Sequence, residues 1–144
     1  MRLLILLILV LATKSVSLQE PHMNNVPGKA ITLETLETMF ENIEENPGWD
    51  TSSDLLWGYF FTHREPSKLE EAKAYLVSEG YHFVKIYLSD KEDPKEPDKY
   101  WLHVEKNETH SPKSLDARND VFYIYANEIG LDSYDGMDVG PIEK

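Results

Sequence analysis

The chain has 144 residues, which is the length of one ordinary domain. It holds 26 Asp and Glu against 14 Lys and Arg, and the net charge of −12 opposes contact with nucleic-acid phosphates or anionic lipid in the absence of a basic patch. No cysteine is present, which excludes disulfides, thiolate metal sites and a cysteine nucleophile. With 41% apolar residues the chain can bury a core, so we expect a folded domain.

The first seventeen residues have the layout of a secretory signal peptide. Arg2 precedes an apolar run from Leu3 to Ala12, which is about half of the roughly twenty residues needed to span a bilayer. We therefore expect cleavage after Ser17 and an exported protein, periplasmic or secreted; an uncleaved membrane anchor is the alternative. Residues 18–30 contain two prolines, a glycine and paired asparagines, and are expected to form a flexible linker.

Apolar residues recur at helical spacing over residues 31–47 and predict an N-terminal helix. Its apolar face consists of Leu33, Leu36, Phe40 and Ile43. The run Leu55–His63 is short and rich in aromatic residues, which predicts a buried strand. Ser67 and Glu70 form a capping-box pattern that predicts the start of the next helix, and Gly80 is expected to end that helix in a left-handed conformation.

Alternating residues in Tyr81–Leu88 and in Tyr100–Lys106 predict two half-buried strands joined by a charged loop. Ser111-Pro112 predicts the start of another helix, which Gly130 ends, and Leu131–Val139 is the last predicted strand. This order predicts an α+β fold, a ferredoxin-like β-α-β-β-α-β sandwich with an extra N-terminal helix. In such a sandwich two helices cover one face of a four-stranded antiparallel sheet.

Five short motifs along the predicted sandwich occur in a characteristic order. They are Asp54-Leu55-Leu56-Trp57-Gly58-Tyr59-Phe60-Phe61, Glu79-Gly80-Tyr81, Trp101-Leu102-His103-Val104-Glu105, Ser111-Pro112-Lys113-Ser114-Leu115 and Gly130-Leu131-Asp132-Ser133-Tyr134-Asp135-Gly136. Together they resemble the domain named for the regulator of ribonuclease E activity B, over Asp54 to Val139, and we assign residues 54–144 to such a domain.

The resemblance implies the same ferredoxin-like fold and a non-enzymatic role as a protein inhibitor of an RNA-degrading enzyme. Met137 departs from the family pattern, which has an aromatic residue at this point, often Trp. Because ribonuclease E works at the inner face of the bacterial membrane, the predicted leader implies that the fold is kept and the partner is different.

No pattern for catalysis or metal binding is found in the sequence. The five histidines lack metal-ligand spacing, the acidic residues around Gly136 do not fit a calcium loop, and no nucleophile elbow or phosphate-binding glycine loop occurs. We therefore expect a protein that is not an enzyme and has no cofactor. Asn107-Glu108-Thr109 is a glycosylation sequon in a predicted surface turn, relevant only in a eukaryotic source.

The sheet face away from the predicted helices collects aromatic side chains. If Leu102 and Val104 face the helices, the outer face holds Tyr81, Phe83, Tyr87, Trp101 and His103, with Trp57 or Phe60 from the first strand. Three alternatives follow: the N-terminal helix buries these rings, a protein docks on them, or they stack on RNA bases. The negative charge and the lack of a Gly-aromatic pattern in the third strand oppose the RNA alternative.

We interpret the chain as an acidic, non-enzymatic protein-binding domain. The predicted partner-binding residues are Trp101, His103, Phe83, Tyr87, Tyr134, Asp135 and Gly136. The expected partner is a protein, and a basic surface on it would complement the acidic chain. The alternative function is an enzyme or small-ligand carrier that uses the aromatic face as the floor of its site.

Overall fold

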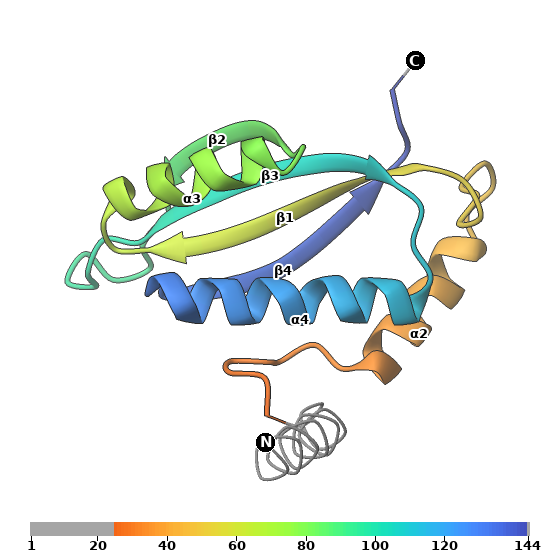
Figure 1. The fold of residues 1–144 in the computed structure, drawn as a ribbon, viewed down its shortest axis with the longest axis horizontal. Helices are drawn as coiled ribbons and strands as arrows, with labels where there is room; N and C mark the ends of the chain where they lie inside the picture. The colour runs from red at the N-terminus through yellow and green to blue at the C-terminus, as the bar shows by residue number, and fades with distance from the viewer. Residues whose placement is uncertain (1–24, 144) are drawn as a thin grey trace, which may run out of the picture.

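A computed structural model describes residues 25–143 of the protein. The predicted leader lies outside these residues, as does the first part of the predicted linker. The described chain has α+β architecture, with three helices and a four-stranded antiparallel sheet, and confirms the predicted fold class at this level (Figure 1). The elements are α2 (Leu33–Glu44), β1 (Leu55–His63), α3 (Pro66–Ser78), β2 (His82–Leu88), β3 (Tyr100–Glu108), α4 (Pro112–Ile129) and β4 (Ser133–Gly140).

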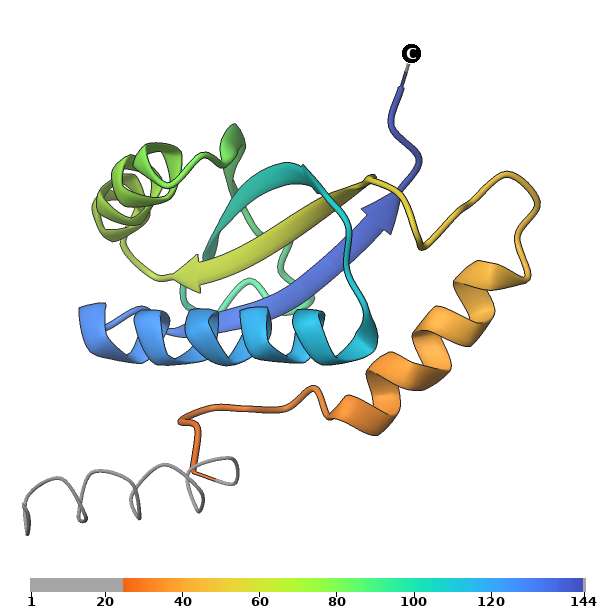
Figure 2. The same cartoon turned by 45° about the vertical axis from the view of Figure 1, so that its right-hand side comes forward.

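The sheet has the strand order β2-β3-β1-β4, and each neighbouring pair is antiparallel. Helices α3 and α4 lie on the same face of the sheet, and α2 lies beside the N-terminal end of α4 (Figure 2). The opposite face of the sheet carries none of these three helices. This arrangement gives the strands two different surroundings, one packed against helices and one turned to solvent.

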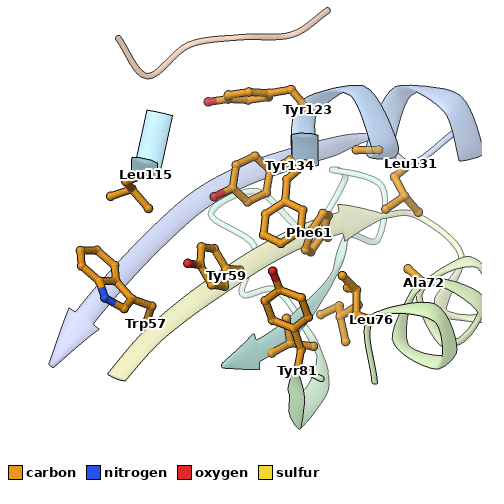
Figure 3. Packing of buried hydrophobic residues seen from close by; sticks show 14 of the residues in the cluster. Trp57, Tyr59, Phe61, Ala72, Leu76, Tyr81, Leu115, Tyr123, Leu131 and Tyr134 are labelled. Atoms are coloured by element: carbon orange, nitrogen blue, oxygen red, sulfur yellow. The ribbon is translucent and has the colours of Figure 1, made fainter. Parts of the chain in front are cut away.

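The core lies between the sheet and the helices and is mostly aromatic (Figure 3). Trp57, Tyr59 and Phe61 alternate along β1 and are each no more than 1% exposed. From α4, the ring of Phe122 lies with its centroid 5.0 Å from that of Tyr59 and 5.2 Å from that of Phe61. Burial of each large ring contributes about 1.5–3 kcal/mol, so this contact layer fixes α4 against the sheet.

Helix α2 extends the core at one end of the sheet. Of the four residues predicted on its apolar face, Leu36, Phe40 and Ile43 are buried and Leu33 is half-buried. The ring of Phe40 stacks on that of Trp57 with centroids 5.9 Å apart. The helix begins because Thr32 accepts a hydrogen bond from the Thr35 backbone N–H.

The segment before α2 is bound to α4. Lys29 pairs with Asp120 at 2.7 Å and with Asp116 at 3.0 Å, and the Ile31 backbone N–H donates to the hydroxyl of Tyr123. Lys29, within the predicted linker, thus contacts α4, and the flexibility of residues 18–30 stays a prediction.

Helix termini follow the predicted chemistry at three of four places. Ser111 caps α4 by accepting from the Ser114 backbone N–H, and Gly130 and Gly80 adopt left-handed φ angles of 78° and 96°. The predicted Ser67–Glu70 capping box is wrong. Glu65 is the N-cap of α3 and Pro66 opens the helix, where its missing N–H costs nothing.

Strand β2 contains a bulge that the sequence did not predict. Phe83 pairs with Val104. Lys85, two residues further along β2, pairs with His103, which is adjacent to Val104 in β3. Val84 is therefore the extra residue that breaks the predicted strict alternation. The bulge places Phe83 on the helix side of the sheet, and Lys73 Nζ of α3 lies 4.0 Å from the centroid of its ring.

Asn107 lies within β3, opposite Leu56, and not in the predicted surface turn. Its side chain is exposed, and β3 continues to Glu108, two residues beyond its predicted end. The hydroxyl of Thr109 donates to Asp54 at 2.7 Å. Asn107 and Glu108 of the sequon are thus part of a paired strand, and Thr109 follows its end.

Candidate functional site

The strand register defines which side chains lie on the sheet face opposite α3 and α4. On this face β1 contributes Phe60, paired with His103 of β3, and β2 contributes Tyr87, paired with Trp101 of β3. We call this surface the open sheet face; it consists of Phe60, Lys85, Tyr87, Trp101, His103, Glu105 and Asp138. Because α2 packs on α4 and Trp57, the alternative in which the N-terminal helix buries these rings is wrong.

Four aromatic rings form a continuous platform on the open sheet face. Phe60 stacks on His103 with centroids 4.4 Å apart, and its edge meets Trp101 at 6.3 Å. Trp101 and Tyr87 are nearly parallel, at 8° and 6.4 Å. All four side chains are half-buried, so each ring presents part of its surface to solvent. Aromatic pairs of this kind are rigid and suit a contact surface.

Two lysines of the chain lie over rings of the platform. Lys85 Nζ is 4.6 Å from the centroid of Tyr87, and Lys99 Nζ is 4.7 Å from that of Trp101. At this distance the negative ring face attracts an ammonium group, with about 0.5–1 kcal/mol at exposed sites. The platform is therefore able to receive cationic side chains.

Carboxylates border the same platform from β4. Burial, followed by the charges of Asp138 and Asp135, raises the pKa of the Tyr87 hydroxyl, so both carboxylates act on the ring of β2. A Cβ on Gly58 would collide with Asp138 Oδ1 and lie 2.8 Å from His103 Nε2. Glycine at this position therefore makes room for both side chains. His103 Nε2 is buried and bonds to no described residue.

Three predicted site residues lie where the sequence places them. Trp101, His103 and Tyr87 are on the open sheet face. Asp135 is exposed, and its negative charge contributes to the raised pKa of the Tyr87 hydroxyl.

The other predicted site residues lie elsewhere. The bulge turns Phe83 to the helix side, so its predicted place on the outer sheet face is wrong. Tyr81, which was expected on the same face but not as a site residue, is buried in the core with its ring centroid 5.8 Å from that of Tyr59. Tyr134 is also in the core, where its hydroxyl donates to Asn119 Oδ1 at 2.6 Å (Figure 3). Gly136 pairs with Phe60 in the strand register, but it is buried, and a Cβ there would approach Ile31 Cδ1 at 3.1 Å, so it is a packing position.

Sequence reasoning missed Asp138, which lies on the open sheet face, and Lys99, whose ammonium group lies over the ring of Trp101. Strict alternation from the buried Tyr134 would place Asp138 on the helix side, so the sequence alone does not predict its position on the open sheet face. Lys99 precedes β3 and had no periodicity to place it. A bulge in β4, between the partners of Phe60 and Phe61, sets the register that brings Asp138 to this face.

Met137, the departure from the family pattern, faces the helix side opposite Tyr59. Its sulfur accepts from Asn119 Nδ2 at 3.4 Å, and the side chain packs against the core. Met137 is therefore part of the contact between β4 and α4. The residue does not contribute to the open sheet face.

A polar cluster around Glu108 joins β1, β3 and α4 inside the helix side. Arg118 Nη1 donates to both carboxylate oxygens at 2.8 Å, the Tyr59 hydroxyl donates at 2.8 Å, and His110 Nε2 lies at 3.0 Å. Burial alone would raise the pKa of Glu108, but the hydrogen bonds from His110, Arg118 and Tyr59 outweigh it and lower the pKa to about 2. Sequence reasoning did not predict this cluster because its members come from three separate elements.

Within residues 25–143, no set of three or more His, Asp or Glu side chains is arranged to hold a metal ion. None of the helices in this part of the chain combines the length and the apolar character needed to cross a membrane.

Comparison with protein families matches residues 34–139 to the regulator of ribonuclease activity B. The match begins in α2 and ends in β4, so it includes the whole helix-covered sheet except the last residue of β4. A search of curated proteins gave no match. The family match covers most of the chain and agrees with the resemblance carried by the five motifs, and the chain therefore belongs to the regulator of ribonuclease activity B family.

Proposed function

We propose that this chain is a non-catalytic regulatory domain that binds a basic segment of a protein partner on its open sheet face. The observation that carries the proposal is the aromatic platform of Phe60, His103, Trp101 and Tyr87, bordered by carboxylates of β4. The family is one of regulators, which supports a role through protein binding. Arginine or lysine side chains of a partner would occupy the remaining ring surface.

Charge supports a basic partner. The chain has a net charge of −12, and Glu105, Asp135 and Asp138 border or lie on the docking side of the sheet. Complementary charge speeds association and rejects acidic competitors. The half-buried rings would supply the apolar anchor contacts that usually dominate binding energy.

We further infer that the domain is exported and that its partner lies outside the cytoplasm, on the basis of the signal-like leader. The partner would then differ from a cytoplasmic ribonuclease. The strand order β2-β3-β1-β4, with two crossover helices on one face, supports assignment of the sandwich as ferredoxin-like.

The enzyme or ligand-carrier alternative has weaker support. A cleft of about 550 Å³ lies at the loop between β2 and β3, where Arg64, Asp98 and Asp132 line it. The rings of the open sheet face do not line this cleft.

Site-specific photo-crosslinking tests the proposal in the compartment where the protein resides. A benzophenone side chain replaces Trp101 in one variant and Phe83 in the matched control, since Phe83 is an exposed aromatic residue on the helix side. We expect a protein adduct at position 101 that is absent at position 83.

The captured partner is then purified and titrated with the natural chain, Trp101→Ala and Phe83→Ala. Trp101→Ala should weaken binding at least tenfold, which corresponds to more than about 1.4 kcal/mol. Equal affinity for the two variants, or adducts at both positions alike, would reject the open sheet face as the docking surface.

A further inference from the structure

A second concave site lies on the helix side of the sheet, opposite the open sheet face. It is a pocket of about 320 Å³ between α3 and α4, and we call it the α3–α4 pocket. Its walls and floor include Leu76, Tyr81, Lys106, Arg118, Phe122 and Tyr125. A volume near 300 Å³ is sufficient for a small ligand or one large side chain.

Two cations converge on the floor of this pocket. Lys106 Nζ and Arg118 Cζ lie 4.7 Å and 5.6 Å from the centroid of the same ring, that of Tyr81. Both face Glu108, at 3.8 Å from Lys106 and 2.8 Å from Arg118. The single carboxylate of Glu108 therefore lies beside two positively charged groups.

Arg118 has hydrogen-bond donors left over. Only its Nη1 group bonds to Glu108, and neither Nη2 nor Nε bonds to a described residue. These nitrogens are not among the buried unpaired atoms, so they are not sealed from solvent, and Arg118 is one of the residues that line the pocket. The carboxylate that lines the pocket is that of Glu79, which lies beside the Tyr75 hydroxyl and raises its pKa.

The remaining wall is apolar and aromatic. Tyr75 and Tyr125 stack with centroids 4.6 Å apart and an interplanar angle of 25°. Val121, on the α4 side, is 60% exposed. A ligand could therefore bury an aromatic or aliphatic group against this wall while an attached anion meets the unused donors of Arg118 and the ammonium of Lys106.

We propose that the α3–α4 pocket binds a carboxylate attached to an aromatic or aliphatic group. Such a group occurs in free arylalkanoic acids and at the C-terminus of a peptide that ends in an aromatic residue. The pocket is on the opposite side of the sheet from the proposed docking surface. The two proposals can therefore fail separately.

An NMR titration with 3-phenylpropionate tests the inference. The sequence has three arginines, and the Nε–H signal of Arg64 serves as an internal control for that of Arg118. We expect the Arg118 signal to shift and saturate while the Arg64 signal stays in place. The uncharged 3-phenylpropionamide should produce no such shift.

Two variants locate the site. Lys106→Gln should weaken the apparent affinity for 3-phenylpropionate at least fivefold, whereas Lys99→Gln, an equal charge change outside the pocket, should leave it unchanged. Trp101→Ala should also leave it unchanged, which separates this test from that of the open sheet face.

Two peptides distinguish the sources of the carboxylate. A hexapeptide that ends in phenylalanine with a free carboxylate is compared with its C-terminal amide and with 3-phenylpropionate. Tighter binding of the free-carboxylate peptide points to a protein C-terminus, and equal binding of both acids points to a small acid. No shift of the Arg118 signal with any probe up to about 10 mM, or equal shifts with the amides, would overturn the inference.

Discussion

At the scale of single residues, the Glu108 carboxylate is held by side chains from several parts of the described chain. It receives hydrogen bonds from Arg118 and Tyr59 and lies beside His110. Burial and the charge of Glu108 raise the pKa of the Tyr59 hydroxyl, which keeps this donor protonated. The cluster thus joins three elements through one charge.

The lowered pKa of Glu108 predicts how stability depends on pH. A carboxyl group with a folded-state pKa of about 2, below its ordinary 4.5, stabilises the fold above pH 4.5, and this contribution is lost as the pH falls toward 2. Glu108→Gln should therefore lower the free energy of unfolding at pH 7 by about 1–2 kcal/mol, a value reduced by solvent screening because the carboxylate is not fully buried.

Urea denaturation at several pH values checks this prediction. The difference between the natural chain and Glu108→Gln should shrink steadily below pH 4.5. Glu105→Gln, on the same strand but half-buried on the open sheet face, is the control and should change stability by less than about 0.5 kcal/mol. A difference independent of pH would contradict the electrostatic explanation.

Single positions also show where sequence reasoning stops. Alternation placed Trp101 and His103 correctly, because β3 runs without interruption from Tyr100 to Glu108. The same rule failed for Phe83, because one extra residue in β2 reverses the side on which a side chain lies. No local sequence signal marks that bulge; it depends on how β2 pairs with β3.

At the scale of elements, α2 is part of the folded core. Phe40 is 5% exposed and stacks on Trp57, and the family match already begins at residue 34. The apolar spacing predicted the helix and its buried residues. It could not predict the packing partner, because an apolar stripe fits the open sheet face as well as the end of α4.

Phe40→Ala tests the role of α2. Removal of a buried aromatic ring leaves a cavity beside Trp57 and should lower the free energy of unfolding by about 3–5 kcal/mol. Chemical denaturation measures this loss, and Glu41→Ala, an exposed change in the same helix, should have little effect. The opposite result would be an unchanged free energy of unfolding together with faster hydrogen exchange at the amides of α2 alone. In that case α2 would be attached independently and would not be part of the core.

At the scale of the whole molecule, the charge pattern favours binding of a basic protein over binding of nucleic acid. The lysines of the open sheet face lie over Tyr87 and Trp101, and carboxylates border the same platform. Such a surface cannot neutralise a run of phosphates. The fold therefore presents rings in a position suited to stacking, with a charge pattern that favours basic proteins.

Electrophoretic shift assays and stopped-flow kinetics test this charge argument. We expect no RNA shift at physiological ionic strength, and an association rate with the captured partner that falls as salt rises. Asp138→Asn should slow association more than it speeds dissociation, with Glu41→Gln on α2 as the control. Micromolar, salt-sensitive RNA binding would instead favour base stacking on the aromatic platform.

The contact of Lys29 with α4 also determines where the chain enters the domain. Because Lys29 is held by Asp116 and Asp120, residue 25 and its neighbours lie along α4, on the far side of the sheet from Phe60 and Trp101 (Figures 1 and 2). A tether or fused domain placed ahead of residue 25 would therefore emerge behind the molecule. An immobilised protein attached there would present its open sheet face outward, free to meet a partner in solution.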